Sequence, residues 1–388
     1  LRLQLKQFAL DYDDLLYFTL YILQHFEDAR REWTEKLNYV MVDEVQDCTG
    51  DDWKLLHAVT QHHGNLFVVG DPDQAIYEWR GANPKIFVDF KAQTDIILNE
   101  NYRSTPDILD VANHIIEHNH NRVKKELFTV KLNERQVVHL HAKSEKEEAE
   151  RIASRIEEGI KEGMKYGEFA ILYRSSFLSR QMEQALLKHH IPYSVWGGVR
   201  FFERKEIKDV LSYLRVVASD TDDLSFRRII NLPARKFGEA SMKALIKIAE
   251  SEGVSLMNAL RYHIDDKTFS KPSLRKFIDL IDSARERVSL MPVSELTDWI
   301  LNESGLGDLY RIDEEEERLE NLTELINSMK EFEEVRIDEG DADLVSYLQE
   351  IALYTNADKS MDSEKVRMMT IHQSKGLEFP EVFVVGLT

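Results

Sequence analysis

Two short apolar runs near the start of the chain each end in acidic and amide side chains. The first lies in VMVDEVQD, residues 40–47, and the second in FVVGDPDQAIYEWRGA, residues 67–82. Such runs predict strands buried in a parallel sheet, and in open α/β sheets ligands bind beyond the carboxyl ends of the strands. We therefore expect one polar rim, made by Asp43, Glu44, Asp47, Asp71 and Gln74.

The alternation of apolar runs and amphipathic stretches continues along the chain. Helical spacing predicts helices within residues 1–39 and at 53–59, 105–119, 145–163 and 179–189. Further apolar runs predict strands at 66–69, 96–98, 137–141, 169–173, 191–196, 366–371 and 382–385. This order predicts an α/β fold with parallel sheets covered on both faces. Between residues 217 and 362 strand signals nearly vanish, which predicts an all-helical insertion.

Composition narrows the class of protein. The chain has 388 residues, 43% of them hydrophobic, which is enough for two or three domains. Its formal net charge of −20 disfavours general binding to nucleic acid but leaves room for a local basic groove. No apolar run reaches the roughly 18 residues of a membrane span, and the single Cys48 argues against a disulfide framework. We expect a cytoplasmic protein that does not associate with membranes.

The chemistry of the polar rim suits a metal-bound nucleoside triphosphate. Asp43 can hold Mg²⁺ because this ion prefers few carboxylates together with substrate phosphates. Glu44 beside it can share the metal or take a proton from an attacking water, and Gln74 can orient that water or the γ-phosphate. Each of these residues taken alone fits turn chemistry or a helix cap equally well.

Several longer stretches point to one family. They are LNENYRST (98–105), FAILYRSS (169–176), GGVRFFERKEIKD (197–209) and MMTIHQSKGLEF (368–379). Together with the two rim segments, which resemble a Walker B motif and a glutamine-containing motif, they resemble superfamily 1 DNA helicases of the UvrD, PcrA and Rep group. The likeness runs in order over nearly the whole chain.

The resemblance implies two RecA-like parallel-sheet domains, the first incomplete, with the helical insertion in the second. It places the end of the first domain at residues 1–103, the second at 104–216 and 363–388, and a helical accessory domain at 217–362. No GxxxxGK[ST] phosphate loop occurs in the sequence, and the family's last arginine motif is missing. We therefore expect a fragment that is inactive by itself.

Further nucleotide contacts follow from the resemblance. Arg103 acts as an arginine finger on the γ-phosphate, and Tyr102 stacks on the adenine. Gly376 and Glu378, in the GLEF segment, reach the ribose or metal region from the second domain. If the surrounding motif is disregarded, Arg103 is better explained as a surface arginine that pairs with an acidic side chain.

DNA contacts are expected from aromatic and basic side chains. Tyr77 and Trp79 follow Gln74 closely, and aromatic side chains can stack on unpaired bases; the alternative is that both are core aromatics. Arg80 can bridge the same elements. Phosphate contacts are plausible for Arg174 and Arg180, although exposed arginines are common. The resemblance adds His372, which touches the single strand.

These expectations combine into one functional hypothesis and a rival. The hypothesis is an ATP-dependent DNA helicase, with ATP and Mg²⁺ as cofactors, that moves 3′ to 5′ on single-stranded DNA and unwinds junctions in repair or replication. The rival is a non-catalytic module derived from a helicase that binds nucleic acid or protein. A repair or transcription protein could bind through residues 217–362, because their acidic surface suits a protein partner better than bulk DNA.

Overall fold

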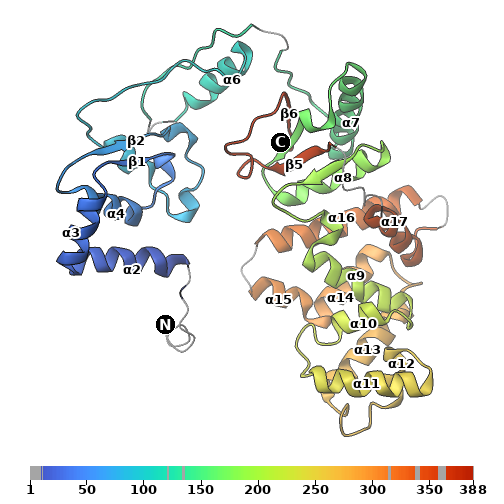
Figure 1. Cartoon of the computed structure of the whole chain (residues 1–388). Coiled ribbons are helices and arrows are strands. Elements are labelled where there is room, and N and C mark those ends of the chain that lie inside the picture. Colours follow the sequence, from blue (N-terminus) through green and yellow to red (C-terminus); the bar gives the residue numbers. More distant parts are fainter. Residues whose placement is uncertain are drawn as a thin grey trace. The chain divides into compact units, whose positions relative to one another are not determined.

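The computed structural model describes residues 10, 12–119, 122–132, 136–312, 316–336, 341–356 and 364–387. The chain divides into two compact units, Leu1–Leu140 (unit 1) and His141–Thr388 (unit 2). Both combine helices with parallel strands, as Figure 1 shows, so the predicted α/β class is confirmed. No helix in the described part of the chain has both the length and the apolar character needed to cross a membrane.

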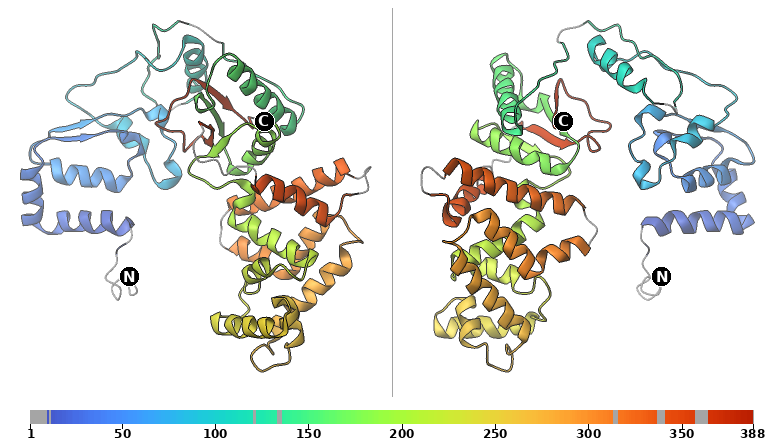
Figure 2. Two further views of the ribbon diagram at one scale, coloured as in Figure 1. Left: turned by 45° about the vertical axis from the view of Figure 1, so that its right-hand side comes forward. Right: turned by 180° about the vertical axis from the view of Figure 1, so that it is seen from behind.

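Unit 1 is built around a short parallel sheet of two strands, β1 (Val40–Val42) and β2 (Leu66–Val68). Helices α2 (Tyr12–His25), α3 (Glu27–Lys36) and α4 (Gly50–Thr60) pack on one another beside it (Figure 2). Thr49 starts α4 with a capping box, because its hydroxyl accepts from Asp52 N while Asp52 bonds back to Thr49 N. The helices predicted here are confirmed, except that residues 1–9 and 11 lie outside the described residues.

Within the described part of unit 1, one face of the β1–β2 sheet is exposed, which corrects the expectation that both strands are buried. Met41 and Phe67 are partners in the strand register, and their side chains point to the same face. Met41 is 78% exposed and Phe67 59% exposed. On the other face Val40 packs against a small core of Leu23, Ala58 and Val59.

Two predicted strands are absent from the structure. Residues 96–98 and 137–141 have no strand conformation, although an isolated bridge pairs Glu100 with Phe128 just beyond the first of them. Ile96, Leu98 and Val138 are all exposed. An apolar run becomes a strand only where a neighbouring strand and a packed face receive it, and neither segment has these. Helices α5 (Pro84–Asp89) and α6 (Pro106–Ile116) complete unit 1.

The sheet of unit 2 has four parallel strands in the order β4-β5-β3-β6. Their bounds are β3 Phe169–Tyr173, β4 Tyr193–Val195, β5 Val366–Thr370 and β6 Glu381–Val384. The strand positions predicted within this unit are thus confirmed, except 137–141 at its border. Helices α7 (Glu145–Lys161) and α8 (Ser179–Lys188) pack together and share the core under the sheet.

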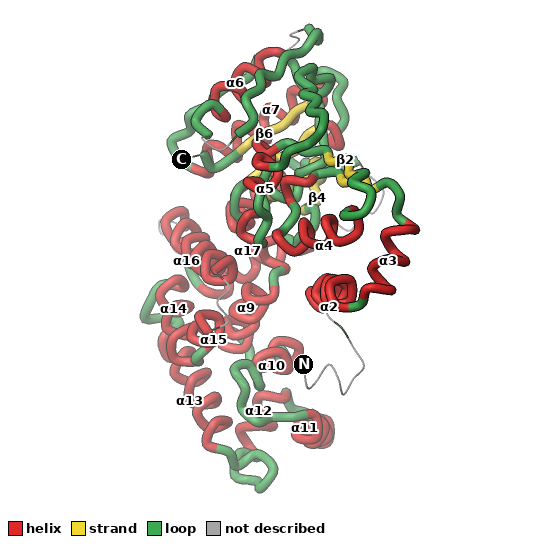
Figure 3. The backbone as a smooth tube through the Cα atoms, turned by 90° about the vertical axis from the view of Figure 1, so that its left-hand side faces the viewer, coloured by secondary structure: helices red, strands yellow, loops and turns green. Residues whose placement is uncertain are grey.

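The rest of unit 2 is helical, as the red tube in Figure 3 shows for α9 to α17. The helices are α9 Lys205–Ala218, α10 Asp223–Ile229, α11 Glu239–Glu252, α12 Leu256–Tyr262, α13 Pro272–Arg287, α14 Val293–Ser304, α15 Leu306–Ile312, α16 Glu316–Arg336 and α17 Leu344–Asn356. One hydrophobic core runs through them from Phe201 to Ile351. The predicted boundaries of the helical insertion, residues 217 and 362, stay predictions. Its residues 313–315, 337–340 and 357–362 lie outside the described residues.

Candidate active site

The polar rim forms where β1 and β2 end side by side. Val69 N donates to Val42 O at 2.8 Å, and Val45 N donates to Val69 O at 3.1 Å, so backbone pairing continues past both strands. Glu44 lies between them with φ 51° and ψ 38°, in the left-handed region. A non-glycine residue there carries backbone strain, which is characteristic of functional positions. The bend leaves Asp43 and Glu44 exposed at the strand end.

A buried amide side chain, Gln46, connects the two halves of the rim. Its Nε2 donates to Glu44 Oε2 at 2.5 Å, and its Oε1 accepts from Asp71 N at 3.0 Å. Gln74 Nε2 then donates to Asp71 Oδ2 at 2.9 Å. Glu44, Asp71 and Gln74 are therefore joined in one hydrogen-bonded chain, and the gathering expected from the sequence is confirmed for these three.

Sequence reasoning missed Gln46, although a signal was present. It is the amide within DEVQD, and it is fully buried although polar. A buried amide must satisfy its donors and acceptor within the protein, so an amide flanked by rim carboxylates is a good candidate for a connecting residue.

Gly70 allows the rim to close. A Cβ added at Gly70 would lie 2.9 Å from Val45 Cγ1 and would also collide with Gln46 Oε1. Any side chain there would push the Gln46 amide off Asp71 N. The glycine of VVGDPDQ is thus explained by close packing rather than by an unusual backbone angle.

The carboxylates at the end of β1 fit a Mg²⁺ ion that is shared with phosphates. Asp43 Oδ1 accepts from Glu44 N at 2.8 Å, and the carboxylate is otherwise presented to solvent. Among the described residues no three His, Cys, Asp or Glu side chains gather as a protein-only metal site. Mg²⁺ needs no such cage, because one or two carboxylates, phosphates and water suffice.

The NENYRST segment of unit 1 forms a tight turn. Asn101 Oδ1 accepts from Arg103 N at 3.0 Å and from Ser104 N at 2.7 Å, which leaves the Tyr102 and Arg103 side chains exposed. Tyr102 OH donates to Glu100 Oε2 at 2.8 Å, and this hydrogen bond raises the pKa of Tyr102. Both side chains can therefore meet a ligand, and their roles stay predictions.

The aromatic residues after Gln74 differ in exposure. Trp79 is 67% exposed, so the alternative of a core aromatic is wrong for it, whereas Tyr77 is half-buried. The guanidinium of Arg80 lies 4.6 Å from the Trp79 ring centroid and 5.4 Å from that of Tyr77. This arrangement holds a flat ring at the surface, as stacking on a base requires.

The two arginines of LYRSSFLSR have different surroundings. Arg174 follows β3 and is exposed. Arg180 is 1% exposed, pairs with Glu324, and donates to Glu331 Oε2 at 3.1 Å. Burial alone would lower the pKa of the Arg180 guanidinium, but the charges of both glutamates more than offset it and raise the pKa. Arg180 links α8 to α16 through these ion pairs. The prediction that Arg180 contacts a phosphate is therefore wrong.

The remaining predicted site residues lie just after β5 in unit 2. His372 is half-buried, Gly376 has φ 82°, and Glu378 is exposed. Gln373 holds this segment in place, because its Oε1 accepts from Thr370 N at 3.0 Å. The approach of these residues to the rim of unit 1 stays a prediction.

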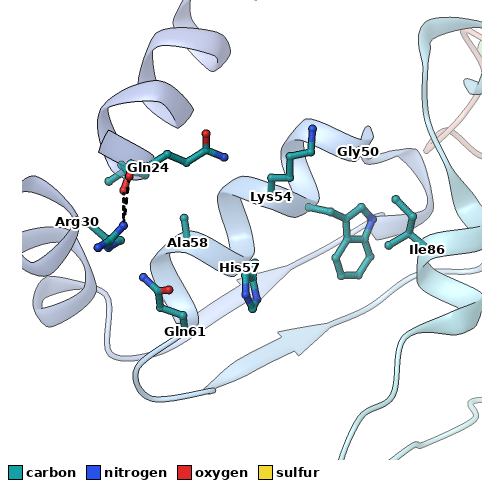
Figure 4. A pocket seen from close by; sticks show the side chains of 10 residues that line it. Gln24, Arg30, Gly50, Lys54, His57, Ala58, Gln61 and Ile86 are labelled. Carbon is teal, nitrogen blue, oxygen red and sulfur yellow. Dashed lines mark hydrogen bonds between the residues drawn. The ribbon is translucent and has the colours of Figure 1, made fainter. Parts of the chain in front are cut away.

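A pocket of about 540 Å³ lies between α2, α3, α4 and α5 (Figure 4). Its lining is Leu23, Gln24, Arg30, Gly50, Trp53, Lys54, His57, Ala58, Gln61 and Ile86. Arg30 on its wall already donates to the Leu23 carbonyl at 3.3 Å. None of these lining residues belongs to the polar rim, and the rim is where the carboxylates and amides converge, so the candidate site is the rim.

Comparison with known proteins identifies relatives over both units. A family model described as UvrD/REP helicase N-terminal domain matches residues 2–95, and one described as UvrD-like helicase C-terminal domain matches residues 96–270 and 258–388. A protein named ATP-dependent DNA helicase PcrA from Staphylococcus epidermidis is 37% identical over 390 residues, and one of the same name from Staphylococcus aureus is 35% identical over 389. Each alignment covers 98% of this chain and 53% of the relative, so the chain spans about half the length of these relatives.

Proposed function

The chain belongs to the UvrD-like helicase family, and on that premise we propose that it forms part of an ATP-dependent DNA helicase. The relatives that carry this name align with nearly the whole chain. Because the chain spans about half of them, the proposal assigns ATP turnover and DNA unwinding to the whole protein. Titration of the 388-residue chain with nucleotide tests the expectation that it is inactive by itself.

The observation that carries the proposal is the hydrogen-bonded chain through Glu44, Gln46, Asp71 and Gln74. It fixes a carboxylate and an amide together at the carboxyl ends of two parallel strands, where α/β sheets bind ligands. Glu44 accepts the proton of the attacking water, and Gln74 orients that water or the γ-phosphate. Asp43, with Glu44 beside it, would hold Mg²⁺, which supplies positive charge to the triphosphate.

Other residues complete the proposed nucleotide site. Arg103 is a permanent cation whose planar fork suits the charge that grows on a transferred phosphoryl group. Tyr102 stacks on the adenine. Gly376 and Glu378 reach the ribose or metal region from unit 2. The exposure of Tyr102, Arg103 and Glu378 supports these roles.

The proposed DNA surface uses Trp79 as its main stacking residue. Tyr77 and Arg80 support the Trp79 ring, and Arg174 and His372 contact the strand, whereas Arg180 is left out because it is buried. Coupling between Gln74 and Trp79 would let the nucleotide state shift the stacking platform. Closing of the site on ATP and its reopening after hydrolysis then move single-stranded DNA past this ring.

Glu44→Gln in the whole protein tests the proposal. The variant keeps the shape of the side chain and removes the charge that accepts a proton, so DNA-stimulated hydrolysis should fall by about 10²–10⁴-fold. Equilibrium binding of a fluorescent ATP analogue should survive. Glu32→Gln is the matched control, because Glu32 is exposed and pairs with Lys36 one helical turn away on α3. Turnover retained in Glu44→Gln would reject the role of the rim.

The finer expectations also belong to the proposal. They are 3′ to 5′ movement, action at junctions of single and double strands, service in repair or replication, a cytoplasmic location, and a repair or transcription partner at residues 217–362. An unwinding assay with 3′-tailed and 5′-tailed duplexes decides the polarity. If the whole protein binds DNA but never hydrolyses ATP, the rival non-catalytic module is the correct description.

A further inference from the structure

Lys125 is a nearly buried lysine that bridges two carboxylates next to the rim. Its Nζ donates to Asp71 Oδ1 and, at 2.9 Å, to Asp73 Oδ2. The side chains of Lys125, Asp71 and Asp73 are 11%, 20% and 7% exposed. A lysine is seldom buried to this degree unless it is paired, so the pairing determines where these carboxylates lie.

Asp71 is the rim residue that Lys125 controls. Its Oδ2 accepts from Gln74 Nε2 at 2.9 Å, its Oδ1 also accepts from Asp73 N at 3.0 Å, and its own N–H reaches Gln46. Without the ammonium, the carboxylates of Asp71 and Asp73 would face each other as like charges. Arg122 compensates only Asp73, at 3.1 Å. Asp71 would then turn toward water and release the Gln74 amide.

The segment that carries Lys125 is also attached to the loop of Arg103. Phe128 N donates to Asn99 O at 3.1 Å, and Asn101 N donates to Phe128 O at 2.7 Å. Lys131 Nζ donates to Arg103 O at 2.8 Å. The same short segment therefore contacts Asp71, which holds Gln74, and the main chain of Arg103.

Helix α6 holds this segment at its base. Asn113 Nδ2 donates to Leu127 O at 2.9 Å, and Leu127 N donates back to Asn113 Oδ1 at 3.2 Å. Arg122 donates to Ile116 O at the end of α6 at 3.2 Å. Because its base is fixed, the segment can set the distance between the Gln74 side of the rim and the Arg103 loop.

Resting on the proposed function, we propose that Lys125 is a positioning residue for ATP hydrolysis. It holds Gln74 in place through Asp71, without touching the nucleotide itself. Displacement of a reacting group by about 1 Å can lower a rate by about 10²-fold. Loss of Lys125 should therefore lower kcat and leave binding of ATP and DNA nearly unchanged.

The test compares Lys125→Met, Lys125→Arg and Gln74→Ala, singly and in combination, in the whole protein. Lys125→Met should lower kcat by about 10–100-fold, with KM for ATP changed by less than about 2-fold, and Lys125→Arg should recover part of the loss. In the Gln74→Ala background, Lys125→Met should have little further effect, because both changes remove the same interaction. Lys54→Met, at an exposed lysine of α4, is the control.

The outcomes separate the two proposals. If the parent protein does not hydrolyse ATP, the proposed function is overturned and the role of Lys125 falls with it. If the parent is active but Lys125→Met keeps its kcat, or its effect multiplies with that of Gln74→Ala, only the positioning role is overturned. Circular dichroism and urea unfolding verify folding, and Lys125→Gln, which keeps a donor without the charge, replaces any Met variant that does not fold.

Discussion

Replacing Arg180 with Met is the sharpest test of the contact between helices α8 and α16 of unit 2. The guanidinium of Arg180 is buried between α8 and α16, where it pairs with Glu324 and Glu331. Met fills much of the same volume without the charge. Glu324, 9% exposed, would remain as a buried carboxylate without its cation, whereas Glu331, 49% exposed, can turn to water.

The expected loss of stability follows from the different exposures of the Glu324 and Glu331 side chains. Breaking a buried ion pair by removing one partner costs about 3–5 kcal/mol. Because only Glu324 is left buried, we expect the lower end, about 3 kcal/mol. Burial already raises the pKa of Glu324, and without Arg180 the carboxyl should bind a proton more readily in the folded state. The loss should therefore shrink as the pH falls.

Urea unfolding of Arg180→Met, Glu324→Gln and the double variant measures this coupling. The double variant should recover most of the loss, because a neutral amide no longer needs the cation. Arg174→Met is the matched control and should stay within about 0.5 kcal/mol of the parent. It should also reduce the salt dependence of single-strand binding by about one phosphate contact, which Arg180→Met should not do. A loss below about 1 kcal/mol for Arg180→Met, the range of surface pairs, would refute the reasoning.

Three further predictions follow from other features. Gly70→Ala should cost about 1–3 kcal/mol through overpacking and should lower ATP turnover, whereas Gly50→Ala, where a Cβ meets nothing within 4 Å, should not; equal unfolding midpoints for the two variants would contradict this. Trp79→Ala should weaken single-strand binding by about 1–3 kcal/mol, and Trp79→Phe should restore part of it; unchanged titrations would remove Trp79 from the DNA surface. The hydrogen bond from His189 to Glu150 raises the pKa of the His189 imidazole above its ordinary 6.5. The protonated ring therefore contributes its full stabilisation of unit 2 below about pH 6.5, and this stabilisation disappears as the pH rises through the higher pKa of the folded state. His189→Gln should flatten that part of the stability profile, and an unaltered profile would count against the assignment.

The sequence predicted strands correctly where an apolar run has a neighbouring strand to pair with in the folded chain. Strands were predicted at 169–173 and at 366–371, and in the structure both are largely buried and pair with each other. The runs at 96–98 and 137–141 look similar in composition but have no neighbouring strand or packed face to receive them. Local pattern cannot distinguish the two cases, because strand formation depends on contacts that the sequence does not state.

The sequence predicted the part of the candidate site that lies at the strand ends, but not the residues that connect it. Strand ends that carry acids and amides placed Glu44, Asp71 and Gln74 at one rim, as the structure has them. The pattern did not single out Gln46 or Lys125, because their importance comes from burial and from a partner that is distant in sequence. Likewise, nothing in LYRSSFLSR distinguished the exposed Arg174 from the buried Arg180, whose partner Glu324 lies on α16.

The strand order of unit 2 has a consequence for biosynthesis. In the described part of the chain β3 pairs with β5 and β6, and β4 pairs with β5. Among these residues, neither β3 nor β4 therefore has a partner strand until the segment after Glu364 has left the ribosome. At about 5–20 residues per second, the wait from Tyr173 to Val366 is on the order of 10–40 s. During that time the nascent chain exposes two strands with unpaired edges, while the helices between them are free to fold first. Chaperone binding to ribosome-bound chains stalled before and after the last two strands would show whether this interval is a vulnerable one.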